Sequence, residues 1–227
     1  MGAAPGLTVL DAGCGPGEDT IGLASVVGPR GRVVGVDFDE SLLRVARARV
    51  KELGLRNVEH RRAQLPRLPF RANTFDAVRS ERVFQHLEQP FESLQALVRV
   101  TKPGGRVVLM EPDWGTLVID AGDTKLERKV LQAGCDFAVN NATAGRRLIG
   151  MFVRAGLGEL TAQISPLQYA DLAAADHYIL SGFEEAALPK VGARVMKQWR
   201  TALELAQHER RFFATFNCVI ACGTKLR

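Results

Sequence analysis

Short apolar runs alternate along this chain with longer segments whose apolar residues recur every three or four positions. Short runs of this kind are typical of buried strands, and the periodic segments are typical of amphipathic helices that pack on a sheet. The alternation therefore predicts βαβ units and an α/β fold with a mainly parallel sheet. We predict strands at residues 7–10, 32–36, 57–61, 74–80, 106–110, 159–165 and 212–221.

Helices are predicted between these strands, several of them ended by glycine or proline. They cover residues 18–28, a segment that ends at Gly54, residues 90–101, and two stretches broken around residues 140–141. Residues 65–70, with two prolines in four positions, and residues 111–115 are predicted to be irregular loops. In the helix that ends at Gly54, one apolar stripe is expected to face the sheet: Leu42, Val45, Ala46, Val50 and Leu53.

No change in composition marks a linker and no internal repeat is present, so we predict a single domain over residues 1–227. Within it, residues 166–210 carry an alanine-rich helical pattern and are interpreted as an insertion between the last two strands. Trp199 shares the helical spacing of the apolar residues around it, which favours a place in the core. His60 and His208 stand among charged residues and are expected at the surface.

Composition and charge exclude several classes of protein. Of the 227 residues, 46% are hydrophobic and 24% are charged, a balance typical of a folded domain rather than a disordered chain. The net charge of +5 is spread from Arg30 to Arg227, and a nucleic-acid-binding face needs concentrated charge, so we expect no nucleic-acid partner. Because no run of about 18 apolar residues is present, and the start lacks a signal-peptide pattern, we expect a cytoplasmic protein without a membrane span.

The four cysteines are predicted to be reduced and buried. Cys14, Cys135, Cys218 and Cys222 have spacings that match no zinc motif, and a chain of this length does not need disulfides to fold. Cys218 and Cys222 lie four residues apart in a strand-like run, so both point to one face of the strand. We therefore expect small buried hydrophobic side chains and no metal site.

The first predicted strand runs into a glycine-rich turn at residues 11–17, and the second ends at Asp37. Glycines allow the backbone to approach a ligand closely, and the helix that follows presents unpaired N–H groups. A carboxylate at Asp37 can accept hydrogen bonds from both hydroxyls of a ribose. Since ligands of open parallel sheets bind beyond the carboxyl ends of the strands, the pattern predicts a ligand that contains adenosine.

Two ligand classes use this layout, and Glu18 distinguishes them. The dinucleotide fingerprint, started at Gly13, needs a third glycine at position 18, where this chain has a carboxylate that repels a pyrophosphate. The acid at Asp11 suits instead a ligand that carries an ammonium group. S-adenosylmethionine combines an adenosine, an ammonium and a sulfonium.

Residues 9–17 resemble the first motif of class I S-adenosylmethionine-dependent methyltransferases, in particular the branch with the ubiquinone and menaquinone biosynthesis methyltransferases. Residues 36–38 are similar to the second motif, residues 68–78 resemble the "LPF…FD.V" segment, and residues 102–106 resemble the "KPGG" turn. The four motifs occur in order over residues 7–111, the predicted cofactor-binding half. The resemblance implies a Rossmann-like, seven-stranded, mostly parallel sheet of order 3-2-1-4-5-7-6 with helices on both faces.

The resemblance also implies which residues contact S-adenosylmethionine. They are Asp11, Gly13 and Gly15 at the methionine end, Asp37 at the ribose, Phe38 against the adenine, and Ser80 at the end of the fourth strand. Gln64 stands where the family usually has an acidic residue near the adenine, with Leu65 beside it. Its amide oxygen can accept from the adenine amino group, although a solvated loop glutamine is the alternative.

Catalytic candidates follow the fourth and fifth strands. His86 is the preferred general base because its ordinary pKa is near neutrality; the alternative is a histidine bonded to backbone at a helix start. Glu111 is expected either to bind a substrate hydroxyl or ammonium or to accept from backbone N–H groups. Glu81 and Arg82 are expected to form an ion pair or contact substrate, and Trp114 to stack on an aromatic substrate or to pack in the core.

The resemblance also places substrate recognition in the 166–210 insertion. Tyr169, His177, Tyr178 and Trp199 are its candidate pocket residues. Family members normally carry a helical lid before the first strand, and this sequence reaches that strand by Leu7. We therefore expect an open methionine end of the cofactor site. Three candidates are left to take the place of the lid, namely the insertion, a symmetry-related subunit or nothing at all, and the insertion is favoured for the substrate side.

The function predicted from these residues is S-adenosylmethionine-dependent methyl transfer to a hydroxyl, carbon or amine of a small organic metabolite. Two alternatives stay open at this point. One is an S-adenosylmethionine-binding protein that does not methylate, such as a cyclase or a regulatory partner, and the other is an NAD-dependent oxidoreductase, which Glu18 disfavours. The expected partner is a small-molecule substrate, and a homodimer is left open.

Overall fold

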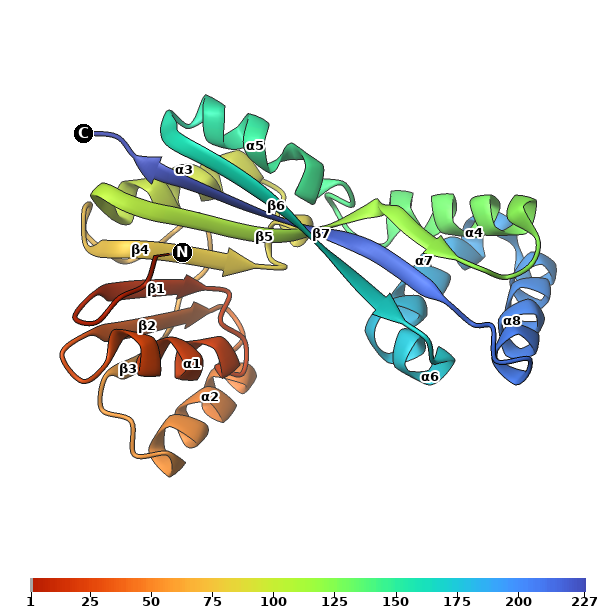
Figure 1. Cartoon of the computed structure of the whole chain (residues 1–227), viewed down its shortest axis with the longest axis horizontal. Helices are drawn as coiled ribbons and strands as arrows, with labels where there is room; N and C mark the ends of the chain where they lie inside the picture. The colour runs from red at the N-terminus through yellow and green to blue at the C-terminus, as the bar shows by residue number, and fades with distance from the viewer. Residues whose placement is uncertain (1) are drawn as a thin grey trace. The chain divides into compact units, whose positions relative to one another are not determined.

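The computed structural model describes residues 2–227, which divide into two compact units (Figure 1). Unit 1 comprises the described residues up to Glu111, with Arg147–Gln163 and Ile220–Arg227, and unit 2 comprises Pro112–Arg146 and Ile164–Val219. The prediction was a single domain with an insertion at 166–210. Unit 2 is larger than that insertion because it also takes in residues 112–146.

Seven strands form one sheet in the order β3-β2-β1-β4-β5-β7-β6, which confirms the predicted order. The strands are β1 (Thr8–Ala12), β2 (Arg32–Asp37), β3 (Val58–Arg62), β4 (Phe75–Glu81), β5 (Thr101–Ile119), β6 (Leu157–Tyr169) and β7 (Ala214–Lys225). The helices are α1 (Glu18–Val27), α2 (Glu40–Glu52), η1 (Phe84–His86), α3 (Pro90–Val100), α4 (Thr124–Phe137), α5 (Ala144–Arg154), α6 (Leu172–Ala175), η2 (Asp176–Leu180), α7 (Ser181–Val191) and α8 (Ala193–His208).

In unit 1, strands β1 to β5 pair in parallel, which brings the carboxyl ends of β1 to β4 to one edge. β1 pairs with β2 and with β4, β2 pairs with β3, and β4 pairs with β5. Asp11 is in register with Gly35 on one side and with Arg79 on the other. The loops that follow β1, β2 and β4 therefore meet at this edge, where ligands of open parallel sheets bind, and the middle of β5 at Met110 stands beside the end of β4.

The amino-terminal helix α1 covers the sheet through a buried cluster. Ala24 and Val27 of α1 pack with Val9, Val33 and Ala77 of three strands. Burying a valine side chain stabilises a fold by roughly 1.5–3 kcal/mol, so this cluster fixes α1 firmly behind the turn at residues 11–17.

The apolar stripe predicted for α2 was wrong in part. Leu43, Ala46 and Val50 face the core, whereas Leu42, Val45 and Leu53 are exposed. One residue rotates a helix by about 100°, so residue 43 lies on a stripe next to that of residue 42. Both stripes are apolar here, and the sequence pattern alone does not show which of the two faces the sheet.

The irregular loop predicted at residues 111–115 is part of β5, which continues to Ile119. Within unit 2, the Asn217 N–H donates to Thr116 Oγ1, and the Asp120 N–H donates to the Phe213 carbonyl. These partners lie about a hundred residues away along the chain, so no local pattern reveals them. β6 likewise extends to Tyr169, so that residues 166–169 are strand and not part of a helical insertion.

The expected burial of the cysteines and of Trp199 and the expected exposure of His208 are confirmed, and the expectation for His60 is wrong. All four cysteines are buried thiols outside any disulfide, Trp199 is fully buried, and His208 is exposed. His60 is buried because its ring packs beneath the turn that follows β1 instead of facing solvent. Over residues 2–227, no helix has the length and apolar character needed to cross a membrane.

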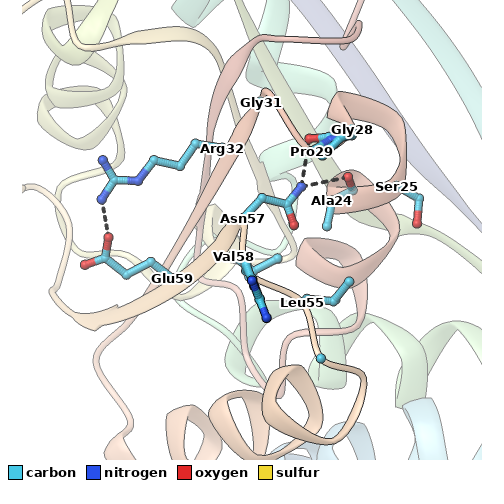
Figure 2. A pocket seen from close by; sticks show the side chains of 12 residues that line it. Ala24, Ser25, Gly28, Pro29, Gly31, Arg32, Leu55, Asn57, Val58 and Glu59 are labelled. Atoms are coloured by element: carbon cyan, nitrogen blue, oxygen red, sulfur yellow. Dashed lines mark hydrogen bonds and ion pairs between the residues drawn. The ribbon is translucent and has the colours of Figure 1, made fainter.

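One cavity of unit 1, of about 780 Å³, lies at the amino ends of β2 and β3 (Figure 2). Asn57 donates there to the carbonyls of Ala24 and Gly28 at the end of α1, and Arg32 pairs with Glu59. These groups are already paired with one another, and the cavity is at the other end of the strands from Asp11 and Asp37.

Candidate functional site

The turn after β1 is built on glycines with left-handed backbone. Gly13, Gly15 and Gly17 have φ angles of 80°, 51° and 84°, a region that favours glycine. A Cβ on Gly13 would lie 2.2 Å from Val83 Cγ2, so this glycine lets the segment after β4 pack closely. A Cβ on Gly15 would meet no atom within 4 Å, so the space above it is open to a ligand.

Asp37 fastens this turn to the end of β2. Its Oδ2 accepts from the Gly15 N–H at 2.9 Å and its Oδ1 accepts from the Asp39 N–H at 2.9 Å. A carboxylate oxygen can accept about two hydrogen bonds, so each oxygen keeps one acceptor position. The side chain is 7% exposed, and two adjacent acceptors of this kind match the two hydroxyls of a ribose.

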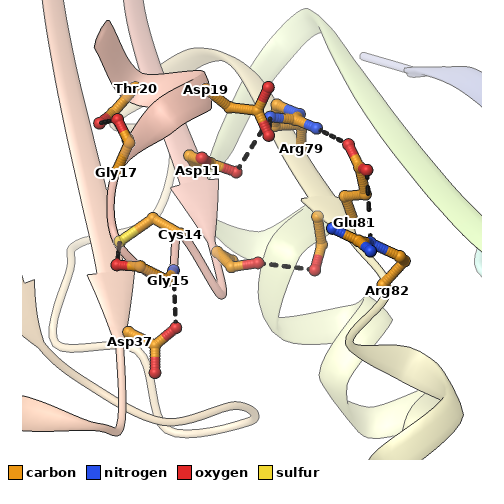
Figure 3. A network of polar contacts seen from close by, with 12 residues as sticks. Asp11, Cys14, Gly15, Gly17, Asp19, Thr20, Asp37, Arg79, Glu81 and Arg82 are labelled. Carbon is orange, nitrogen blue, oxygen red and sulfur yellow. Dashed lines mark hydrogen bonds and ion pairs between the residues drawn. The ribbon is translucent and has the colours of Figure 1, made fainter. Parts of the chain in front are cut away.

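An acidic cluster surrounds Arg79 next to this turn (Figure 3). The Arg79 guanidinium lies 3.7 Å from Asp11 and 2.8 Å from Asp19, and it also pairs with Glu81. Three carboxyl groups lie around the Arg79 guanidinium and Arg82 pairs with one of them, Glu81, so the cluster holds one carboxyl group more than guanidinium groups. Burial raises the pKa of Asp11 to about 7, although the charge of Arg79 opposes the rise. A bound ammonium group would favour the ionised form of this carboxyl.

Phe38 and Gln64 border the site after β2 and β3. The Phe38 side chain is 64% exposed, while its carbonyl accepts from Arg62 Nε at 3.1 Å. Ala63 donates its N–H to the Asp37 carbonyl, which brings the next residue, Gln64, to the same edge of the sheet. Gln64 is exposed and Leu65 is buried. The exposed ring offers a flat apolar surface to a base, as the family resemblance implies.

Ser80 is placed differently from the other candidate cofactor contacts. Its hydroxyl donates to the Ala12 carbonyl at 2.7 Å, and the side chain is almost fully buried. The bond ties the end of β4 to the end of β1. A direct contact of Ser80 with the cofactor stays a prediction. In the structure, the hydroxyl holds the ends of these two strands together.

Glu111 accepts from backbone N–H groups, which is one of the two roles expected for it. It is completely buried, and its carboxylate accepts from the N–H groups of Val83 at 2.9 Å, Phe84 at 2.8 Å and Gln85 at 3.2 Å. Burial raises the pKa of Glu111 to about 7, against the effect of these three donors. The side chain therefore positions η1 and is not presented to a substrate.

His86 ends the short helix η1 that Glu111 holds. His86 is exposed, and its backbone N–H donates to the Val83 carbonyl. Partial burial of the ring lowers the pKa of His86, so the imidazole is neutral near pH 7 and able to take a proton. Nearby, Arg82 lies 3.6 Å from Glu81, so the expected ion pair is present and is shared with Arg79.

Residues 3–156 match a family model described as a methyltransferase domain. The chain belongs to the class I S-adenosylmethionine-dependent methyltransferases. It is 40% identical over 119 residues to the demethylmenaquinone methyltransferase of Lactococcus lactis, covering 52% of this chain and 47% of that protein. The resemblance to the menaquinone-like branch is thereby confirmed.

Two further comparisons extend over more of the chain. An uncharacterised 37.1 kDa protein in transposon Tn4556 of Streptomyces fradiae is 36% identical over 179 residues, covering 79% of this chain and 51% of that protein. The YcgJ protein of Bacillus subtilis is 19% identical, with a TM-score of 0.64 over 100% of this chain and 94% of that one, which supports the fold alone. The chain spans about half the length of the curated relatives it matches.

The residues present fit S-adenosylmethionine, the methyl donor of this family. The space above Gly15 is open, Asp37 has two acceptors for a diol, and the cluster around Arg79 carries the negative charge that a cationic ligand needs. Glu18 and Asp19 stand in the first turn of α1, where they disfavour a pyrophosphate. The site therefore suits an adenosine with a cationic side chain better than a dinucleotide.

In unit 2, four of the predicted substrate-recognition residues come together with two phenylalanines. The centroid of the Trp114 ring lies 4.5 Å from that of Phe216 and 5.1 Å from that of Phe183. Tyr169 is stacked on Phe216 with 6.5 Å between the ring centroids. Tyr178 lies 6.0 Å from Tyr169 and 4.6 Å from His177, while Trp199 is in the core and donates to Glu184. We call Trp114, Tyr169, His177, Tyr178, Phe183 and Phe216 the aromatic group.

Sequence reasoning missed three polar residues of the site. Arg79 and Asp19 belong to the acidic cluster, and His60 lies beneath the glycine turn. A signal for Arg79 was available, since a basic residue inside an apolar strand must find carboxylates or remain unpaired. His60 has no such signal, because its partner stands forty residues away in the chain.

Proposed function

We propose that this chain transfers the methyl group of S-adenosylmethionine to a hydroxyl, carbon or amine of a small organic metabolite. The observation that carries the proposal is the Asp37 carboxylate, which fixes Gly15 and keeps one acceptor position on each oxygen beside open space. When bound, S-adenosylmethionine supplies an electrophilic methyl group on a sulfonium.

The proposed roles of the chain's own residues follow from their surroundings. Asp37 binds the ribose hydroxyls, and Phe38 packs on the adenine, with Gln64 accepting from its amino group. Asp11, with Asp19 and Glu81, attracts the ammonium end, and Arg79 limits the repulsion between these carboxylates. The turn glycines bring the backbone within reach of the ligand.

His86 is the proposed general base for acceptors whose nucleophile carries a proton. Its neutral imidazole takes that proton as the acceptor attacks, while Glu111 keeps η1 in place through three backbone hydrogen bonds. The remaining contribution is alignment of the reacting groups, which supplies several of the roughly 7–11 kcal/mol available from orientation.

We propose that the aromatic group of unit 2 binds the acceptor, which then has a planar or apolar part. Tyr178 is 64% exposed, so the group presents aromatic surface to a ligand. Aromatic faces bind flat apolar molecules through area burial and stacking. We further propose a cytoplasmic location and no nucleic-acid partner, which cell fractionation and a nucleic-acid binding assay test.

Calorimetry and product detection test the proposal. We expect S-adenosylmethionine and S-adenosylhomocysteine to bind and NAD not to bind, and we expect S-adenosylhomocysteine to be released when an organic metabolite pool is added. Binding without release in any pool would favour the non-methylating alternative. Binding of NAD alone would overturn the cofactor assignment.

A further inference from the structure

His60 of β3 lies directly beneath the glycine turn and is 7% exposed. Its Nε2 lies 2.9 Å from Thr20 Oγ1, whereas its Nδ1 is buried with no hydrogen-bond partner. A Cβ on Gly17 would lie 3.1 Å from His60 Nε2, and a Cβ on Gly35 would lie 2.7 Å from its Cδ2. Two glycines thus leave the room that this imidazole fills.

The position of the protons follows from counting donors. Thr20 Oγ1 donates to the Gly17 carbonyl at 2.8 Å, and a hydroxyl has a single proton to give. Toward His60 the same oxygen must therefore accept, so the imidazole carries its proton on Nε2 and leaves Nδ1 as a bare acceptor. Burial, followed by the nearby charge of Arg47, lowers the pKa of His60 and agrees with a neutral ring.

This chain of hydrogen bonds ends at Gly17, the residue directly before α1. Gly17 is the N-cap of α1, and its carbonyl accepts from the Ile21 N–H as well as from Thr20 Oγ1. Asp37 holds the same turn two residues earlier, through the Gly15 N–H. The turn is therefore fastened at two points, by a carboxylate at its middle and by the His60–Thr20 pair at its end.

A purely structural role does not account for the histidine well. An unpartnered buried acceptor destabilises a fold, and an apolar side chain of similar size would avoid that cost. What the imidazole adds is the Nε2–H donor that orients the Thr20 hydroxyl. We propose that His60 and Thr20 are positioning residues that set the shape of the cofactor-binding turn, an inference that rests on the proposed binding of S-adenosylmethionine.

Matched substitutions at the two positions test the proposal. His60→Leu removes the donor and the orphaned acceptor, while His60→Gln keeps an amide N–H for Thr20. Thr20→Val removes the hydroxyl at constant shape, while Thr20→Ser keeps it. For each variant, calorimetry gives the Kd of S-adenosylhomocysteine, and thermal unfolding without ligand gives the stability.

We expect His60→Leu and Thr20→Val each to raise the Kd by about tenfold, the equivalent of one lost hydrogen bond of ordinary strength. The KM for S-adenosylmethionine should rise with the Kd, and kcat should change little. His60→Gln and Thr20→Ser should remain within about twofold of the parent chain, and the double variant should be no weaker than either apolar variant.

Several outcomes would overturn the inference. They are an unchanged Kd in His60→Leu and Thr20→Val, a Gln or Ser variant as weak as its apolar counterpart, or Kd losses that follow the loss of stability across all four variants. If His60→Leu does not fold, Thr20→Val and Thr20→Ser decide the question.

A measurement without ligand separates this inference from the proposed function. Nuclear magnetic resonance of the ¹⁵N-labelled imidazole should show His60 neutral with its proton on Nε2, and a proton on Nδ1 at pH 7 would contradict the proposed chain of donors. A parent chain that shows this tautomer yet fails to bind S-adenosylhomocysteine would overturn the proposed function and the positioning role together. Binding by the parent chain with unaffected variants would overturn the positioning role alone.

Discussion

The cofactor edge of unit 1 and the aromatic group of unit 2 are built by different means. At the edge, backbone N–H groups from residues 15, 39 and 83–85 bond to just two carboxylates, Asp37 and Glu111. In the aromatic group, rings from β5, β6, η2, α7 and β7 contact one another and share no backbone pattern. A site made of short loops next to parallel strands has a sequence motif, whereas a site made of rings gathered from distant elements has none.

Because the two regions are built differently, we expect some substitutions to change only turnover, others only the Kd of the cofactor, and others only the KM of the acceptor. The largest effect is expected at His86. If it is the base, His86→Ala should lower turnover by about 10²–10⁴-fold, because general-base catalysis contributes that much, with an unchanged Kd for S-adenosylhomocysteine. Steady-state kinetics with an identified acceptor and calorimetry measure both quantities.

His208→Ala is the matched control for that substitution, because His208 is exposed at the end of α8. It should leave turnover and affinity unchanged. An equal loss of turnover and of cofactor affinity in His86→Ala would show that this histidine maintains structure and is not the base.

Asp37→Ala should have the next largest effect. It removes both ribose acceptors and the bond to Gly15, so we expect the Kd for S-adenosylhomocysteine to rise by about tenfold or more. Asp39→Ala is the control: Asp39 caps α2 by accepting from the Ser41 and Leu42 N–H groups, so its loss should cost about 1 kcal/mol of stability without weakening the ligand. A folded Asp37→Ala variant of unchanged affinity would remove the basis of the cofactor assignment.

The pKa values of Asp11 and Glu111 are both raised to about 7. They predict an effect of pH on stability that is smaller than the effects of the two substitutions above. The folded chain keeps these protons to higher pH than the unfolded chain, so the stability they contribute is complete below about pH 4 and declines as the pH rises to about 7. Over this range the two groups should lower the melting temperature of the ligand-free chain, against the opposite effect of carboxyl groups whose pKa is lowered, such as Asp76. Asp11→Asn should reduce that fall.

Binding of S-adenosylmethionine should follow the opposite trend, because only the ionised Asp11 attracts an ammonium group. We expect its affinity to increase several-fold as the pH passes through about 7, with release of protons on binding. Calorimetry in buffers of different ionisation enthalpy measures that release. An affinity that does not depend on pH in the parent chain would contradict the proposed contact between Asp11 and the methionine end of the cofactor.

The smallest effect is expected in the aromatic group. Tyr178→Ala removes a largely exposed ring, so the fold and the cofactor Kd should be unchanged, while the acceptor KM should rise a few-fold. Phe137→Ala, at the end of α4 and outside the aromatic group, is the control for loss of an exposed ring. Equal effects of the two substitutions on the KM would speak against binding of the acceptor by the aromatic group.

The residues of the glycine turn were predictable because they rest on a local pattern, whereas the strand order was predicted only through the family resemblance that the four motifs imply. The strand that ends at Asp37 and the turn at residues 11–17 are short segments in which spacing determines geometry. The burial of His60 was not predictable, since it depends on Thr20 and on space left by Gly17 and Gly35.

Similar reasons explain the other differences. Leu42 and Leu43 are equally apolar neighbours, and only the tertiary contacts of α2 determine which of them is buried. The continuation of β5 through Pro112 depends on partners in β7, far along the chain. Where local pattern and distant partners disagree, the distant partners determine the structure.

The burial of all four thiols makes this protein well suited to fluorescence labelling. Cys14, Cys135, Cys218 and Cys222 are shielded from maleimide reagents in the folded chain, and the Cys222 sulfur also accepts from the Arg106 guanidinium. A cysteine introduced at an exposed apolar position, such as Leu53→Cys in unit 1 or Val118→Cys in unit 2, would then react almost alone. A donor and an acceptor dye on these two positions would show whether their separation changes when S-adenosylhomocysteine binds, with no native cysteine removed.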